Sequence, residues 1–420
     1  MNVNNEQETQ ASRFLTEELP GTGGWIKEKP ADFAVEELPL YSPSGEGGHT
    51  FFEIRKVGLS TFQAVRAISQ ALRVTANRIS YAGLKDAQAV TCQVLSVDGV
   101  APEVVMAVEV PNIRIMWAER HDNKLRIGHL RGNRFTLRIR GIDESLVERC
   151  RAILDVLGQR GVPNRYGPQR FGQRGDSDLL GREVVRRDAS AFVQRFLGGP
   201  HPNESATVQE ARAAFEAGRW AEALALFPYS MSDERRALQI LIQSGGDDRR
   251  VLAGVPRRLR TFLVSAYQSK LFNRVLDARL HTLDRVYTGD LAMKHHGRSV
   301  FYVEDAEVEQ PRAARFEISP TGPLYGYKMI QAAGRQGELE AAVLAAEGMA
   351  LPDFRVGEGI RAEGERRALR FPVHEPEQWY DEGIMLRFWL PRGCYATAVL
   401  AEIMKVPLLS EGVESAEDVT

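Results

Sequence analysis

Residues 81–90, Tyr-Ala-Gly-Leu-Lys-Asp-Ala-Gln-Ala-Val, place a lysine beside an aspartate just before an apolar-rich run that predicts a strand. Two interpretations of Lys85 and Asp86 are open. They are the solvated charges of a turn, where aspartate is common. Alternatively, Asp86 is a carboxylate that attacks an electrophilic carbon or accepts a proton. A nearby cation would keep that carboxylate ionised. Adjacent residues of an extended chain point to opposite sides, so Lys85 need not be that cation.

The loop at residues 164–174, NRYGPQRFGQR, interleaves three arginines with two aromatic residues: Arg165, Arg170 and Arg174 with Tyr166 and Phe171. Guanidinium groups bind phosphates through two parallel hydrogen bonds, and aromatic faces stack on unpaired bases. The same composition also fits a surface loop with solvated arginines and aromatic side chains anchored in the core. Both interpretations are kept.

Two further stretches contain residues that suit a nucleobase. In GNRFTL, the amide of Asn133 has both donors and an acceptor for the edge of a base. Phe135 begins the apolar phase of its strand, which favours a place in the core. Phe33, in ADFAVEE, is either a core residue or a stacking platform, and the pattern favours the core.

These residues must be positioned by strands and helices that the periodicity indicates. We expect strands within 24–39, 50–56, 90–97, 134–142 and 384–390, and short strands around 290–305 and 365–373. Helices are expected from Ser60, which forms a capping box with Gln63, and over 144–158, closed by Gly158. Further helices are expected on both sides of a turn at Gly218, over 258–283 and over 395–406. Strands at both ends and helices between them predict one α+β domain carrying an insertion.

Composition narrows the class of protein. The chain has 420 residues, of which 43% are hydrophobic and 26% charged, as is ordinary for a globular protein. No apolar run is long enough for a membrane span, and no secretory signal is readable. Three cysteines without a CxxC pattern favour the cytoplasm over a disulfide framework or a zinc site. The histidines show no metal-ligand spacing. A net charge of −2 does not indicate nucleic-acid binding, but phosphates are bound by local clusters.

Taken together and in order, several stretches resemble the TruD family of tRNA pseudouridine synthases. They are YAGLKDAQAVTCQ, GNRFTL, VPNRYGPQRFG, SAYQSKLFNRVL, RRALRFP and FWLPRGCYATAVLAEI, and the resemblance extends from about Lys27 to Lys405. It implies a pseudouridine-synthase-type catalytic domain with a mixed or antiparallel sheet, interrupted by an α/β insertion domain. We expect a disordered start at 1–22, the catalytic domain at 23–161 plus 370–408, the insertion at 162–369 and an acidic tail at 409–420.

The resemblance also implies an activity and a set of residues. The family isomerises uridine to pseudouridine, chiefly uridine 13 of certain tRNAs, without metal or organic cofactor. A cytoplasmic enzyme that acts on tRNA is therefore expected, and the chain shows no feature of an obligate oligomer, so we expect a monomer. By carry-over, Asp86 is catalytic, Phe33, Asn133 and Tyr395 surround the target base, and Lys27 lies near the pocket. We add Lys85, Arg165, Arg170 and Phe171 as expected RNA contacts.

The chain departs from the family pattern at two positions. Tyr395 stands where the family usually has phenylalanine, and Ala87 where it usually has lysine or arginine. Two other functions stay open at this point. A non-catalytic RNA-binding or RNA-folding protein would not need Asp86. A hydrolase of glycosidic bonds would need a second, paired carboxylate.

Overall fold

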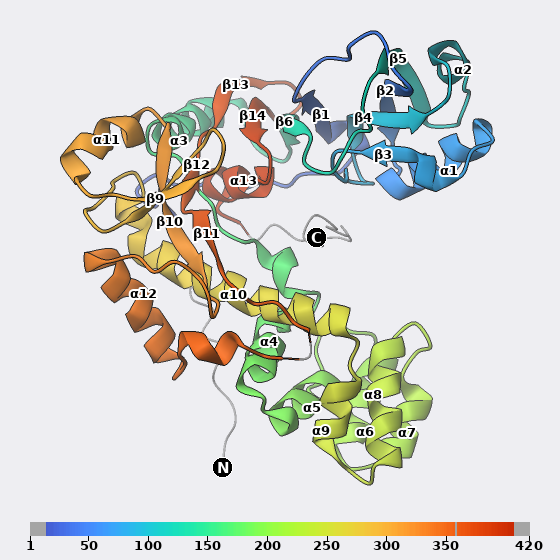
Figure 1. Cartoon of the computed structure of the whole chain (residues 1–420), viewed down its shortest axis with the longest axis vertical. Coiled ribbons are helices and arrows are strands. Elements are labelled where there is room, and N and C mark those ends of the chain that lie inside the picture. Colours follow the sequence, from blue (N-terminus) through green and yellow to red (C-terminus); the bar gives the residue numbers. More distant parts are fainter. Residues whose placement is uncertain (1–13, 358, 407–420) are drawn as a thin grey trace. The chain divides into compact units, whose positions relative to one another are not determined.

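The computed structural model describes residues 14–357 and 359–406. The chain divides into two compact units, the first formed by Met1–Asn164 and Arg370–Thr420 and the second by Arg165–Leu369 (Figure 1). The second unit thus begins at Arg165, whereas the sequence motifs placed the start of the insertion at Val162.

The first unit contains an eight-stranded sheet with the order β13-β14-β6-β1-β4-β2-β5, and β3 pairs with β4. Only β1 and β4 pair in parallel, so the sheet is mixed, as the family resemblance implied. The strands are β1 (Phe33–Pro39), β2 (His49–Val57), β3 (Ile79–Tyr81), β4 (Val90–Asp98), β5 (Ile113–His121), β6 (Leu130–Ile139), β13 (His374–Tyr380) and β14 (Ile384–Pro391).

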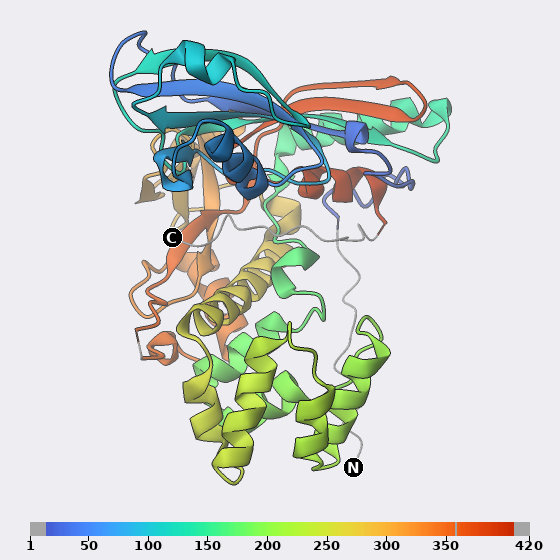
Figure 2. The same cartoon turned by 90° about the vertical axis from the view of Figure 1, so that its right-hand side faces the viewer.

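Helices cover one side of this sheet. Helices α1 (Thr61–Ala71) and α13 (Ala396–Met404) lie on the same side of the strands (Figure 2). Phe52 and Ile54 of β2 are fully buried in a cluster with Ile68 of α1, which explains the alternation in β2. Helix α2 (Pro102–Met106) packs near β5. The predicted capping box is confirmed, because Gln63 N donates to Ser60 Oγ and Ser60 N donates to Gln63 Oε1.

The predicted end of the next helix was wrong. Helix α3 (Val147–Arg160) runs through Gly158 and ends at Gly161, which has φ of 87°. An isolated glycine inside a helix costs about 1 kcal/mol relative to alanine but does not end the helix. The chain reverses only where a positive φ is required, and Gly161 supplies it.

The described part of the expected disordered start is also held in place. The backbone N–H groups of Leu15 and Thr16 donate to the carboxylate of Glu402 in α13 at 3.0 and 3.1 Å. Thr22 N donates to Ile403 O at 2.9 Å. Residues 14–22 therefore belong to the folded unit, which differs from the expectation for 1–22. Residues 1–13 and the acidic tail at 409–420 lie outside the described residues.

The second unit combines helices with a four-stranded antiparallel sheet of order β11-β10-β8-β9. The long helix α10 (Arg257–Arg279) packs against α4 (Ser177–Arg186), where a Cβ on Gly181 would meet Leu263 O at 1.9 Å. The predicted turn at Gly218 is confirmed between α6 and α7. The other elements of the second unit are α5 (Ala189–Leu197), α6 (Ala206–Glu216), α7 (Trp220–Leu226), α8 (Ser232–Gln243), α9 (Asp248–Gly254), α11 (Ala306–Ala314), α12 (Gly334–Ala346), β8 (Leu291–Lys294), β9 (Val300–Tyr302), β10 (Ile318–Leu324) and β11 (Glu365–Ala368).

The chain leaves and re-enters the first unit at adjacent points. Strands β7 (Val162–Pro163) and β12 (Arg370–Phe371) pair antiparallel, with Val162 opposite Phe371. Arg370 is fully buried and donates to Arg160 O at 2.8 Å. An insertion of some two hundred residues can therefore start and end there without interrupting the large sheet.

Candidate active site

The residues singled out first by their chemistry lie on the irregular segment 82–89, which leads into β4. Buried polar groups bond the backbone of this segment. Gly83 O accepts from Gln93 Nε2 at 2.5 Å, and Lys85 N donates to Thr61 Oγ1 at 2.9 Å. Ala82 O accepts from Gly128 N at 2.7 Å. Irregular backbone inside a fold needs such partners, because an unpaired buried peptide group costs about as much as a lost hydrogen bond.

The cation beside Asp86 is Lys27. Lys27 Nζ lies 2.8 Å from Asp86 Oδ2, and each side chain is 18% exposed. The same ammonium lies over the ring of Phe33, 4.4 Å from its centroid. The carboxylate is thus partly shielded from water yet accessible, with a positive charge at hydrogen-bond distance.

Lys85 serves a different carboxylate. Its Nζ lies 2.9 Å from Glu37 Oε2, with 4% and 1% of the two side chains exposed. It also donates to Asn133 Oδ1 at 2.8 Å. Glu37 of β1 and Asn133 of β6 are directly opposite in the sheet, so one lysine from the loop reaches both. The two adjacent charges of the motif therefore point to different partners, although the segment that holds them is irregular and not a strand.

This contact fixes the orientation of the Asn133 amide. An ammonium group can only donate, so the side of the amide that faces Lys85 must be the oxygen. The amide nitrogen is then the end left for another partner, and it makes no hydrogen bond within the part of the chain that the structure describes. Asn133 is half-buried, and its Nδ2 group can donate to a carbonyl oxygen of a bound molecule.

Phe33 and Phe135 are buried, as the strand pattern favoured. Their rings meet edge to face with centroids 6.3 Å apart. The start of β1 is held by Asp32, which accepts from Arg140 Nε and Nη2 at 2.8 and 2.7 Å. Burial opposes ionisation, but hydrogen bonds from Arg140 and from Lys29 N hold the pKa of Asp32 below its ordinary value. This pair fixes the strand end that places Phe33 beneath Lys27.

Tyr395 lies at the N-cap of α13 and is half-buried. It follows β14, in which Leu390 is paired with Asn133 of β6. The chain leaves the sheet beside Asn133 and turns through residues 391–394 before reaching Tyr395. Five of the expected residues, Lys27, Phe33, Lys85, Asp86 and Asn133, are linked by direct contacts or chain adjacency, and Tyr395 belongs to the same unit.

The remaining expected RNA contacts belong to the second unit, where they contact α10. Arg165 forms an ion pair with Asp277, and Arg170 Nε donates to Ser269 Oγ at 3.1 Å. The Arg170 guanidinium also lies 5.6 Å from the ring centroid of Tyr166. Phe171 lies under the ammonium of Lys270. These contacts fit the anchoring interpretation of the loop, and RNA binding by the three residues stays a prediction.

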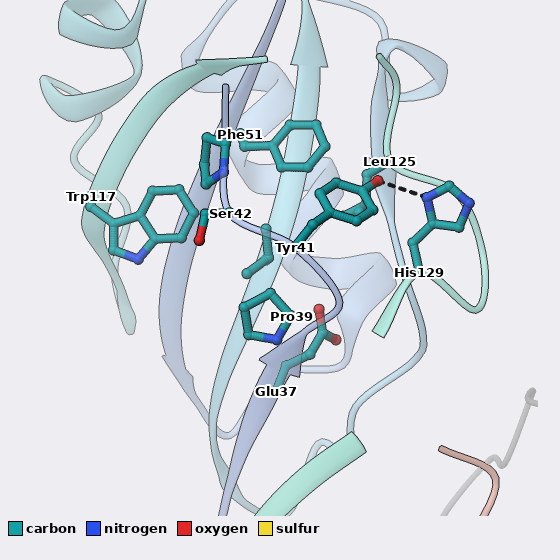
Figure 3. Close-up of a pocket in the computed structure, with 10 residues that line it drawn as sticks. Glu37, Pro39, Tyr41, Ser42, Phe51, Trp117, Leu125 and His129 are labelled. Atoms are coloured by element: carbon teal, nitrogen blue, oxygen red, sulfur yellow. Dashed lines mark hydrogen bonds between the residues drawn. The ribbon is translucent and has the colours of Figure 1, made fainter. Parts of the chain in front are cut away.

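A small cavity of about 130 Å³ lies beyond the end of β1, between Tyr41 and Trp117 (Figure 3). Tyr41 bonds His129 Nδ1 at 2.8 Å, and Phe51 and Glu37 also line the cavity. Asp86 is not among its lining residues. Its walls are mainly apolar and aromatic, and its carboxylate, Glu37, is 1% exposed and paired with Lys85, so the cavity offers no accessible pair comparable with Asp86 and Lys27.

No helix within 14–357 and 359–406 combines the length and the apolar character needed to cross a membrane. In the same ranges, no three or more histidine, cysteine or acidic side chains gather in a way that could hold a metal ion.

Several residues of this site were missed by the sequence analysis, although alternation contained a signal. In β1, Phe33 and Val35 are followed by Glu37 in the same inward phase, and all are buried. In β2, Phe52 and Ile54 are followed by Lys56, and all are fully buried. A charged residue that continues an inward apolar phase indicates a buried polar contact, because period two places it on the core face. Thr61 and Gln93 were missed too.

The fold places the chain in a class. It superposes on a crystal structure from Methanosarcina mazei, assigned to tRNA pseudouridine synthase D (TruD), with a TM-score of 0.85 and 28% identity, covering 94% of this chain and 96% of that one. The two-unit architecture with its mixed sheet is that of a pseudouridine synthase.

The family follows from the sequence comparison. The family model "tRNA pseudouridine synthase D (TruD)" matches residues 10–403. A relative named tRNA pseudouridine synthase D, from Geobacter sulfurreducens, is 48% identical to this chain over 94% of this chain and 97% of that protein. The relative from Geobacter metallireducens is 47% identical, over 94% and 98%. The chain belongs to the tRNA pseudouridine synthase D family.

Proposed function

We propose that the protein converts uridine to pseudouridine at position 13 of tRNA, with Asp86 as the catalytic carboxylate. Membership of the family supports the reaction and the tRNA substrate. The observation that carries the residue assignment is the pair formed by Asp86 and Lys27, a carboxylate and an ammonium 2.8 Å apart and both partly accessible.

The reaction breaks the N-glycosidic bond, turns the uracil and joins it again through carbon 5. The target nucleotide has to leave its stack, because its reacting atoms are otherwise covered. Asp86 either attacks carbon or removes a proton, and both roles need an ionised carboxylate. Lys27 supplies the positive charge beside the carboxylate. Tyr395 supports the uracil, Phe33 supports it only indirectly as the buried ring beneath Lys27, and Asn133 Nδ2 donates to one of the uracil carbonyl oxygens.

The site does not favour hydrolysis of the glycosidic bond. Hydrolysis with a paired acid needs a second carboxylate that is accessible to the substrate. Glu37 is joined to the Asp86 loop through Lys85, but its side chain is 1% exposed and paired with that lysine. An isomerase needs no hydrolytic water, so one accessible carboxylate suffices.

The experiment is a tritium-release assay with unmodified tRNA labelled at carbon 5 of uridine. The Asp86→Asn variant should release no tritium, whereas its Kd for tRNA should stay within about threefold of the wild-type value, since the side chain keeps its shape. Asp98→Asn, at the exposed end of β4, is the matched control and should be fully active.

Two results would contradict parts of this proposal. Near-normal turnover by Asp86→Asn would remove the catalytic role from that residue. Unchanged tritium release from a tRNA carrying cytidine at position 13 would remove the position assignment while leaving the isomerase activity in place. Failure of both the wild type and the variant to release label, with tRNA still bound, would support the non-catalytic alternative.

A further inference from the structure

Lys56 is a fully buried lysine next to the Asp86 loop, and it has no part in the reaction proposed for Asp86. It lies near the end of β2 in the inward phase of Phe52 and Ile54. Its Nζ donates to Leu59 O at 2.5 Å and to Asp86 O at 3.0 Å, and it lies 3.5 Å from Lys85 O. The ammonium therefore binds backbone carbonyls on two segments that are distant in sequence.

The environment makes this an unusual lysine. It has no carboxylate at ion-pair distance within the described ranges. The charged groups that face it are Asp86, which favours its protonated form, and Lys85, which opposes it. Burial outweighs the attraction and lowers the pKa of Lys56 to about 8. A buried ammonium is costly, and a side chain of methionine shape would avoid that cost. In return, the charged ammonium forms strong hydrogen bonds with the backbone carbonyls that it binds.

The bonds around the loop show what Lys56 adds. Gln93 and Thr61 hold Gly83 O and Lys85 N, which precede Asp86. Gly58 N binds Ala89 O at 3.3 Å, at the far end of the loop. Among the residues that the structure describes, Lys56 is the group that bonds the backbone of Asp86 itself. Removing it would leave the loop attached at its ends but free to shift in the middle.

We propose that Lys56 is a positioning residue: its ammonium ties the Asp86 carbonyl to the start of α1, and so holds the Asp86 carboxylate against Lys27 before RNA binds. The proposal rests on the proposed function of Asp86. A reacting group displaced by about 1 Å can lose a hundredfold in rate, so a contact with the backbone of the reacting residue affects turnover more than binding.

The test compares Lys56→Met, Lys56→Arg and, as a control, Lys124→Met at an exposed position of the same unit. We expect Lys56→Met to lower kcat for tritium release by about 30-fold or more, with the Kd for tRNA within about threefold. Lys56→Arg keeps a charged donor and should recover most of kcat. Hydrogen exchange should become faster at residues 83–89 in Lys56→Met and stay unchanged at Val94–Val97 of β4. The control should match the wild type throughout.

A pH profile adds a reading that a purely structural lysine would not give. As the pH rises through about 8, Lys56 loses its proton and its charge-assisted bonds weaken to neutral ones. The wild-type kcat should therefore fall with a midpoint near this pH. Lys56→Arg stays charged and should lack this fall.

Three outcomes would overturn the proposal: wild-type kcat in Lys56→Met, unchanged exchange at residues 83–89, or the same alkaline fall in Lys56→Arg as in the wild type. If Lys56→Met does not fold, the profiles of the wild type and of Lys56→Arg decide the question. A wild type without tritium release would defeat the proposed function, while hydrogen exchange would still test the contact between Lys56 and the loop.

Discussion

At the scale of single residues, the site depends on which lysine pairs with which carboxylate. Asp86 pairs with Lys27, 59 positions earlier in the chain, and not with its neighbour Lys85. Lys85 instead neutralises buried Glu37 and occupies the amide oxygen of Asn133. Each lysine thus pairs with a different carboxylate: Lys27 with the accessible Asp86, and Lys85 with the buried Glu37. The arrangement also presents Asn133 as a hydrogen-bond donor.

The donor role of Asn133 can be tested by substitution. Asn133→Ser retains an O–H donor on a shorter side chain, so its hydrogen bond to the uracil is weakened and kcat/KM should fall by about tenfold. Asn133→Asp replaces the amide nitrogen with a negative oxygen, which would face a uracil carbonyl oxygen. It should lower kcat/KM by about a hundredfold or more, since it removes the donor and adds repulsion. Tritium-release kinetics check both variants, and an aspartate variant at least as active as the serine variant would refute the donor assignment.

At the scale of elements, irregular segments are held by side chains from regular ones. The loop before β4 is bonded by Lys56 from β2, Thr61 from α1 and Gln93 from β4. In the second unit, the 3-10 turn Pro168–Phe171 is attached in the same way, through Arg170 to the serines of α10. The polar groups of these helices and strands replace the backbone bonds that an irregular segment lacks.

Arg170 anchors its loop to α10 and is also predicted to contact RNA, and one variant can separate these two roles. Arg170→Gln removes its bonds to α10 and should lower the melting temperature of the protein. If Arg170 also binds a phosphate, as the sequence pattern predicts for an RNA contact, the slope of log affinity for tRNA against log salt should become shallower by about one unit. Arg236→Gln, at an exposed position of the same unit, is the control for charge and stability. A lower melting temperature with an unchanged slope would limit Arg170 to anchoring.

At the scale of the whole molecule, the chain consists of two compact units, each with its own buried apolar clusters. The first is formed by segments from both ends of the sequence, and β7 and β12 bring the two connections together. Because Pro163 and Arg370 are paired neighbours, a short linker could join them without moving the sheet. Asp86, the proposed catalytic carboxylate, and its cation Lys27 both belong to this first unit.

Removal of the second unit tests this organisation. A chain in which residues 164–369 are replaced by a short Gly/Ser linker should fold with one cooperative thermal transition, since each domain core is able to fold alone. Its affinity for tRNA should fall by about tenfold or more because the proposed arginine contacts are lost. Circular dichroism and tRNA titration measure both. A non-cooperative or aggregated product would show that the first unit depends on the second.

The sequence by itself determined the elements, the outline of the fold and the catalytic candidate. Alternation of apolar residues placed β2, β4 and β14, and the capping box placed the start of α1, since both signals are local. It misplaced the end of α3, because two glycines lie near that end and only the backbone angle at Gly161 distinguishes them. The motif around Asp86 made this residue the catalytic candidate, a role that stays a proposal.

Only the tertiary structure decided the partners. No local pattern shows that Lys27 reaches Asp86, that Lys85 turns to Glu37 and Asn133, or that Lys56 binds the Asp86 carbonyl. These contacts depend on strand register and on where a loop crosses the sheet, and the same side chains could form other pairs in another register. Buried charges have ionic or hydrogen-bonding partners in the fold because an unpaired buried charge is strongly destabilising.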